Sequence, residues 1–283
     1  ESAVSSLDGG SWAERARLDE HAYANALAVA PDGAAWVVAN DASDCPTDSA
    51  GPSCTGTVLL RIDESGASTV DGWREILDGR LAGHVPVVGP DGDVWLLAAS
   101  GETTGDSMTV DHFLRYDGTE WRSIDAPEGL STDAMGASFA IAGDGTIWTA
   151  MASAGTDWHG PNDGLAHLDD SGWTVFTEAD GVPRWGGQFW FATDYLRIAP
   201  DGSAWVNAVV GEMGCDGVAR FDGETGTQFL AGHCVDDFAV ASDGSVWVLA
   251  SATHSDPVYL YNGTDDVDAL ADALDSATDI FGF

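Results

Sequence analysis

The sequence contains no lysine: its ten basic residues are all arginine, against 47 aspartates and glutamates. The net charge of -37 at pH 7 repels phosphate backbones and anionic lipid, so we expect neither nucleic acid nor a membrane surface as a partner. Such an acidic shell suits high salt, where screening suppresses the self-repulsion. We therefore predict a halophilic, solvated surface rather than an acidic binding face.

Long hydrophobic runs and familiar catalytic motifs are also missing. Although 44% of the residues are hydrophobic, no run of eighteen apolar residues occurs, so we expect no membrane insertion. The chain has no G-x-S-x-G elbow, H-E-x-x-H helix, phosphate loop or dinucleotide fingerprint. A function must therefore come from residues outside these motifs.

The four cysteines have no C-x-x-C spacing, which argues against a zinc or redox motif. An even number in a repeat protein favours two disulfides, although three pairings are possible. We favour Cys45–Cys54 and Cys215–Cys234. This predicts an oxidising location: extracellular, cell-surface or periplasmic.

A ten-residue pattern occurs five times in the chain. Each copy has an apolar run, an Asp-Gly pair and a second apolar run that begins with tryptophan, as in A-P-D-G-A-A-W-V-V-A from Ala30. The other copies start at Gly89, Ala142, Ala199 and Ala241. This pattern predicts a tight hairpin with a type I′ turn, since Asp and Gly tolerate positive φ. The turn aspartates are therefore structural.

Two further strands follow each tryptophan, and the second often carries its own ring: Trp73, Trp121, Trp173 and Phe229. Four strands per unit, five times over, predict an all-β, five-bladed β-propeller of four-stranded antiparallel blades. The repeat tryptophans then fill the spaces between blades: Trp36, Trp95, Trp148, Trp205 and Trp247.

The fifth unit lacks a fourth strand, and the N-terminus offers one. Residues 7–18 copy the end of a blade, with Trp12 in the fourth-strand position. We expect one domain over residues 1–262, in which 1–18 close the ring and hide the sheet edges. Because residues 3–7 also resemble a third strand, the alternative is six blades with one degenerate. Residues 263–283 are expected to form a C-terminal extension, either a short helix or a tail.

The string L-R-Y-D-G-T-E-W from Leu114, together with D-G-x-x-W, resembles the repeats of bacterial two-component-regulator propellers. It is similar, more loosely, to streptogramin-lyase-type propellers. The resemblance covers nearly the whole chain and implies a propeller fold in an exported, ligand-sensing or carbohydrate-related context. It carries over no catalytic residue, and those families usually have more blades.

Polar residues occur where four of the five first strands begin, at the end of the blade opposite the Asp-Gly turn. Seven residues before each turn aspartate stand Asn25, His84, Ala137, Asp194 and Asp236. Around one axis, the four polar groups among these could hold Ca²⁺ or another divalent cation. The alternative is a water-filled channel lined by hydrogen-bonding groups.

Three tryptophans fall outside the blade pattern, in the long variable segments of the same end: Trp158, Trp185 and Trp190. Their rings suit stacking on a sugar or another flat ligand, although they could equally form local loop cores. His159, Tyr23 and Asp237 lie near them in the sequence pattern and complete the predicted ligand-binding set.

Two functions are compatible with these residues. The first is a monomeric, exported propeller that binds a small molecule or glycan on the variable-loop face. The alternative is a carbohydrate-active enzyme, a glycoside hydrolase or lyase, in which Asp194 and Asp236 act as acid and base or nucleophile and His84 orients them. A glutamate acid, a common partner in such pairs, is missing from these positions, so we place binding first.

Overall fold

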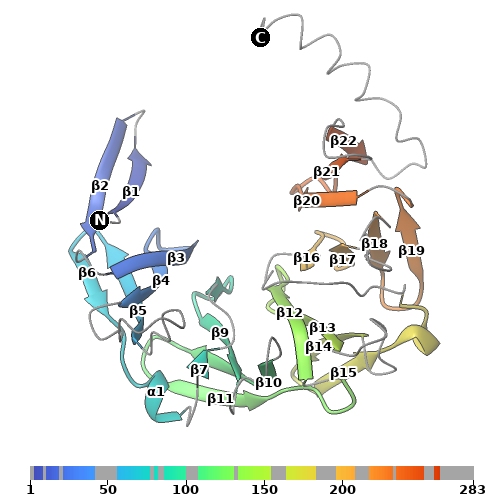
Figure 1. Cartoon of the computed structure of the whole chain (residues 1–283), viewed down its shortest axis with the longest axis horizontal. Coiled ribbons are helices and arrows are strands. Elements are labelled where there is room, and N and C mark those ends of the chain that lie inside the picture. Colours follow the sequence, from blue (N-terminus) through green and yellow to red (C-terminus); the bar gives the residue numbers. More distant parts are fainter. Residues whose placement is uncertain are drawn as a thin grey trace, which may run out of the picture. The chain divides into compact units, whose positions relative to one another are not determined.

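The computed structural model describes thirteen stretches of the chain: residues 3–8, 11–18, 22–41, 56–76, 80–81, 86–99, 108–130, 133–153, 164–182, 196–207, 217–231, 234–251 and 258–261. They belong to two compact units, Glu1–Ala126 and Pro127–Phe283. Strands dominate both units, and they run in chain order from sheet to sheet (Figure 1).

The first unit contains one hairpin and two antiparallel sheets. Strands β1 and β2 form the hairpin, β3 to β6 form repeat sheet 1, and β8 to β11 form repeat sheet 2, where β7 also pairs with β9. Their bounds are β1 Ala3–Asp8, β2 Ser11–Arg17, β3 Ala22–Val29, β4 Ala35–Asp41, β5 Gly56–Asp63, β6 Gly66–Thr69, β7 Arg80–Leu81, β8 Val87–Val88, β9 Val94–Ala99, β10 Met108–Tyr116 and β11 Trp121–Asp125, with the short helix α1 at Trp73–Ile76.

The second unit contains three repeat sheets. Strands β12 to β15 form repeat sheet 3, β16 to β19 form repeat sheet 4, and β20 to β22 form repeat sheet 5. Their bounds are β12 Asp133–Ile141, β13 Ile147–Ser153, β14 Gly164–Asp169, β15 Gly172–Phe176, β16 Leu196–Ile198, β17 Ala204–Asn207, β18 Val218–Phe221, β19 Gly226–Phe229, β20 Cys234–Val240, β21 Val246–Ser251 and β22 Val258–Tyr261, with a 3-10 turn at Glu178–Asp180.

The all-β fold and the four-stranded antiparallel repeats predicted from the sequence are confirmed. Three of the predicted fourth-strand rings lie in fourth strands, namely Trp121, Trp173 and Phe229. Trp73 does not: β6 ends at Thr69, and Gly72, with φ of 93°, turns the chain into α1, which begins at Trp73. The number of blades and the closure of a ring stay predictions.

The Asp-Gly turns join the first two strands of each sheet as predicted, but they are not type I′ turns. A type I′ turn needs positive φ at both central residues. Leu230 is the one non-glycine residue with positive φ in the described stretches, so φ of Asp32 is not positive, whereas Gly33 has φ of 85°. Gly33 N–H donates to Ala30 O at 2.9 Å, which closes a type I turn followed by a left-handed glycine. The reason is the aspartate itself: Asp32 Oδ1 accepts the Ala34 N–H at 2.9 Å and fixes the turn as an Asx turn.

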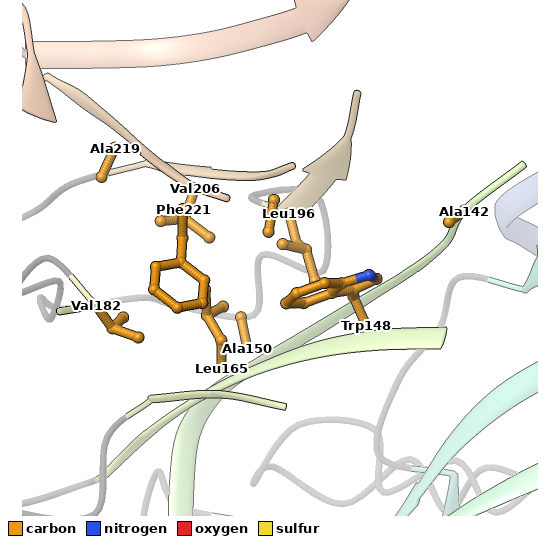
Figure 2. Packing of buried hydrophobic residues seen from close by; sticks show 10 residues of the cluster. Ala142, Trp148, Ala150, Leu165, Val182, Leu196, Val206, Ala219 and Phe221 are labelled. Carbon is orange, nitrogen blue, oxygen red and sulfur yellow. The ribbon is translucent and has the colours of Figure 1, made fainter. Parts of the chain in front are cut away.

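The cores lie between successive sheets, as the repeat tryptophans predict. Trp148 of β13 is 6% exposed and packs in one cluster with Leu196, Val206 and Phe221 of repeat sheet 4. Figure 2 shows the Trp148 indole and the Phe221 ring pointing into the space that the two sheets share. Trp205 fills the next interface, against Phe238 and its neighbours in repeat sheet 5.

The N-terminal hairpin packs on repeat sheet 1. Val4 of β1 and Leu18 after β2 share a buried cluster with Val37, Ala39 and Ile62. Trp12, in the middle of the predicted closing strand, is 74% exposed. The hairpin thus covers one face of repeat sheet 1 while the Trp12 ring stays at the surface.

Candidate functional site

Two of the predicted polar residues lie at β-bulges near the start of first strands. The register between β3 and β4 shifts at Asn25, and the register between β20 and β21 shifts at Asp236. Strand β12 also has a bulge, but two residues earlier: its register against β13 shifts at Met135, and the equivalent residue, Ala137, pairs with Met151. A bulge inserts an extra residue and changes the direction of its side chain, and bulges are frequent next to active sites. All three first strands are thus bulged near their start, and in β3 and β20 the bulge falls on the predicted polar residue.

Neighbouring candidates lie on the same two strands. Asn25 is exposed, and Tyr23 pairs with Asn40 across the β3–β4 ladder. The exposed Asp237 uses Oδ1 to accept the N–H of Phe238 at 2.7 Å, so that oxygen holds the local backbone. Its second oxygen is the one suited to a ligand.

Asn207, the last residue of β17, is a polar residue that the sequence interpretation missed. Its side chain is 2% exposed, and its Nδ2 donates to Val235 O of β20 at 3.0 Å. Within the described residues, its Oδ1 is a buried oxygen that accepts no hydrogen bond. Leaving a buried acceptor unsatisfied costs about 1 to 3 kcal/mol of stability, so the burial of this oxygen requires an explanation. Val235 immediately precedes the bulge at Asp236, so this oxygen belongs to the same end of the second unit.

Other predicted residues lie outside the described residues: His84, Trp158, His159, Trp185, Trp190, Asp194, Cys45, Cys54 and Cys215. Cys234 begins β20. The two disulfides, the four-residue cation site and the aromatic platform therefore stay predictions. In the described stretches there is no group of three or more His, Cys, Asp or Glu side chains arranged to hold a metal ion.

The opposite end of the sheets, where the Asp-Gly turns lie, carries a repeated ion pair. An arginine of the third strand faces the repeat tryptophan and reaches the turn aspartate: in repeat sheet 4, Arg220 faces Trp205 and lies 2.9 Å from Asp201. The same arrangement joins Arg61 to Asp32 at 2.8 Å. A third copy joins Arg115 to Asp91 at 3.5 Å, with the guanidinium 5.4 Å from the ring centre of Trp95. These arginines stabilise the turn end.

The sequence signal for this ion pair is an R-x-D tripeptide at the end of three of the third strands. It was visible in the repeat, but its meaning depends on the register that places each arginine opposite a tryptophan. In repeat sheet 3 His167 takes the position opposite Trp148, with ring centres 5.0 Å apart.

Several aspartates at the turn end have lowered pKa values. The Ala34 N–H and then the Arg61 guanidinium lower the pKa of Asp32. Burial opposes the shift at Asp201, but hydrogen bonds from Ser203 and Arg220 outweigh it, so its pKa is also lowered. The pKa of Asp117 falls to about 2, chiefly through the Thr119 hydroxyl and the Glu120 N–H. These aspartates are charged at neutral pH and act as turn and ion-pair groups rather than as acids.

The described residues enclose a cavity at the turn end in each of the two units. The cavity in the second unit has a volume of about 380 Å³ and lies between repeat sheets 4 and 5, lined by Trp205, Arg220, Asp201 and Asp243. The cavity in the first unit is larger, about 650 Å³, and lies between repeat sheets 1 and 2.

None of the helices in the described stretches has the length and apolarity needed to cross a membrane.

Comparisons with known proteins identify the fold. No family model matches the chain, and no curated protein matches it. Among solved structures, virginiamycin B lyase from Staphylococcus aureus is 15% identical with a TM-score of 0.56, over 94% of this chain and 76% of that one. YCF48 bound to D1 peptide is 13% identical with a TM-score of 0.52, over 92% and 70%. A GH74 enzyme from Niastella koreensis is 13% identical with a TM-score of 0.50, over 91% of this chain and 37% of that one.

At these identities the likeness concerns the fold alone. It confirms the expected resemblance to streptogramin-lyase-type propellers, whereas the resemblance to two-component-regulator propellers stays a prediction. The chain has the β-propeller repeat fold, similar to that of virginiamycin B lyase.

Proposed function

We propose that this protein is an exported, acidic propeller that binds a small molecule or glycan at the sheet ends opposite the Asp-Gly turns, with a divalent cation such as Ca²⁺ in the channel. Asn207 carries the proposal. Among the described residues no group donates to its buried amide oxygen, and such an oxygen is a ready acceptor for a ligand hydroxyl or a hard cation. Its amide nitrogen is tied to the strand that continues into the bulge at Asp236. Asn207 is therefore tied to the backbone residue that precedes Asp236, at this end of the second unit.

The proposal requires the repeats to close into a ring. Closure is supported by two apolar residues that are exposed in the first and last repeat sheets but whose equivalents between other sheets are buried. Between repeat sheets 4 and 5, the tryptophan of one sheet packs on a first-strand residue of the next, Trp205 on Phe238, and both are buried. At the two ends of the array the equivalent residues are exposed: Leu27 at 54% and Trp247 at 43%. Closing the ring would bury both side chains and cover the last strand edges.

The N-terminal hairpin bears on the number of blades. Its two strands pair as a third and a fourth strand do, and it packs on the face of repeat sheet 1 that a preceding blade would cover. In a five-bladed ring β2 completes repeat sheet 5, which already has a third strand in β22. The pairing of β1 with β2 favours the alternative, in which the hairpin is the outer half of a degenerate sixth blade.

Calorimetric titration with Ca²⁺, followed by a panel of neutral oligosaccharides with and without Ca²⁺, tests the proposal. We expect Ca²⁺ binding that Asp236→Asn or Asn207→Leu weakens at least tenfold. The matched control is Asp243→Asn, which removes one charge from the turn end of the same sheet. The proposal would be overturned if the wild type and the three variants bound Ca²⁺ equally, or if neither Ca²⁺ nor any oligosaccharide bound.

The hydrolase alternative has one observation in its favour, the backbone bulge at Asp236, since bulges are frequent next to active sites. In that reading Asp194 and Asp236 flank a glycosidic bond, and His84 orients one of them. Turnover of aryl glycosides by the wild-type protein, lost in both Asp194→Asn and Asp236→Asn, would establish it. Turnover that survives either substitution would assign the chemistry to other residues.

A further inference from the structure

We propose that the cavity between repeat sheets 1 and 2 is a second binding site, one for a neutral saccharide, independent of the site proposed above. It lies entirely within the first unit, at the turn end. Its volume of about 650 Å³ falls within the range of about 300 to 1,000 Å³ typical of small-molecule sites. Aromatic and polar groups share its walls, principally Trp36, Tyr116, Trp121, Arg61, Asp71 and Glu120.

The aromatic wall is held in place by its own hydrogen bonds. Tyr116 and Trp121 have ring centres 4.9 Å apart at 32°, and Trp36 meets Tyr116 edge-on at 5.8 Å. Trp121 Nε1 donates to Asp71 O at 2.9 Å, and the Tyr116 hydroxyl donates to Gly118 O at 3.0 Å. With their polar atoms satisfied and only partly buried, Tyr116 and Trp121 present preorganised apolar ring surface to the cavity.

Gly72 allows this wall to form. A Cβ on Gly72 would lie 3.2 Å from Trp121 Cδ1, and the residue has φ of 93°. A larger residue would therefore be strained and would push against the Trp121 ring. The close approach keeps the indole against Asp71 and beside the cavity.

The polar wall fits hydroxyl groups better than a charged ligand. Arg61 is already paired with Asp32 at 2.8 Å and with Asp63, so its charge is neutralised locally. The exposed carboxylate of Asp71 accepts hydrogen bonds, Glu120 is paired with Arg122, and the net charge of -37 repels anions. With its charge paired, Arg61 gives the wall N–H donors rather than a net positive charge. Ring stacking together with acceptors and one donor is the chemistry that recognises a neutral sugar ring.

Calorimetric titration of the whole chain with cellobiose, maltose, xylobiose and N,N′-diacetylchitobiose tests the site, with tetramethylammonium chloride as the cationic probe. Two variants remove it by different means: Trp121→Ala deletes the stacking ring, and Thr69→Arg fills the cavity from an exposed strand position. The matched control is Trp173→Ala, the equivalent fourth-strand ring of repeat sheet 3.

We expect at least one disaccharide to bind, with affinity reduced tenfold or more in both Trp121→Ala and Thr69→Arg and unchanged in Trp173→Ala. If Trp121→Ala does not fold, Thr69→Arg alone decides. Binding that survives Thr69→Arg, binding of tetramethylammonium alone, or no binding to any probe overturns the proposal. Saccharide binding lost in Asn207→Leu but kept in Thr69→Arg would support the site at the opposite end and reject this one.

Discussion

Truncating the tryptophans between sheets measures how the repeats hold together. Trp148 is 6% exposed, stacks on Phe176 at 6.0 Å and lies in the core between repeat sheets 3 and 4. A buried tryptophan removes roughly 200 Å² of surface from water, which at about 25 cal/mol per Å² amounts to about 5 kcal/mol. Measured losses for Trp→Ala in cores are about 3 to 5 kcal/mol. We therefore expect Trp148→Ala to lower the free energy of unfolding by about 4 kcal/mol.

Trp247→Ala is the matched comparison, because Trp247 holds the same repeat position but is 43% exposed. In the structure Trp247 buries a little over half as much surface as Trp148, so Trp247→Ala should lower the free energy of unfolding by about 2 kcal/mol. If the ring closes over it, the cost should rise to that of Trp148.

Urea unfolding followed by far-ultraviolet circular dichroism, at one fixed salt concentration, gives both values. A loss below about 1 kcal/mol for Trp148→Ala would refute the packing between sheets, since no relaxation of that cluster would absorb so large a deletion. Equal losses at Trp148 and Trp247 support closure, whereas half the loss at Trp247 places it at a free end.

Three further predictions concern charge and backbone. Because the folded pKa of Asp117 is about 2, against 3.8 unperturbed, its stabilisation is complete above pH 3.8 and is lost as the pH falls through 2; the stability gap between wild type and Asp117→Asn in pH-dependent urea unfolding should close over that window, and a gap constant with pH would contradict it. Gly217→Ala should prevent folding, seen as loss of soluble protein, because its Cβ would lie 1.9 Å from Phe229 O, whereas Gly202→Ala, also at positive φ but with open space around it, should cost only about 1 kcal/mol. Raising NaCl from 0.1 to 1 M should raise Tm, because it screens a net charge of -37, and a falling Tm would mean that the arginine pairs dominate instead.

Local chemistry made much of the fold predictable. The five Asp-Gly hairpins and the four-stranded repeats follow from alternating apolar residues and from turn residues that act within a few positions of themselves. The predicted type of turn was wrong, and the reason is also local. The Asp32 side chain accepts a hydrogen bond from the Ala34 N–H two residues ahead, and this keeps Asp32 out of the left-handed region. The prediction for Trp73 was wrong because Gly72 turns the chain into the helix α1, where the repeat pattern predicted a fourth strand.

The candidate sites were less predictable because they depend on contacts between strands and between sheets. The sequence located Asn25 and Asp236 near the start of first strands, but the bulges at both depend on a shift of register against the neighbouring strand. The repeat did mark the position of Asn207 as buried, since the other copies have Val38, Leu97, Ala150 and Leu249 there, but its hydrogen-bond partner lies on another sheet.

The sequence alone determined the repeat, the position of each hairpin and the tryptophans that fill the spaces between sheets, because each of these features is encoded within one ten-residue stretch. Tertiary structure decided the rest: the ion pair of Arg220 with Asp201, the buried oxygen of Asn207 and the aromatic cavity of Trp121. These features join residues that are 19 to 50 positions apart, and only strand register and the packing of one sheet on the next bring such residues together.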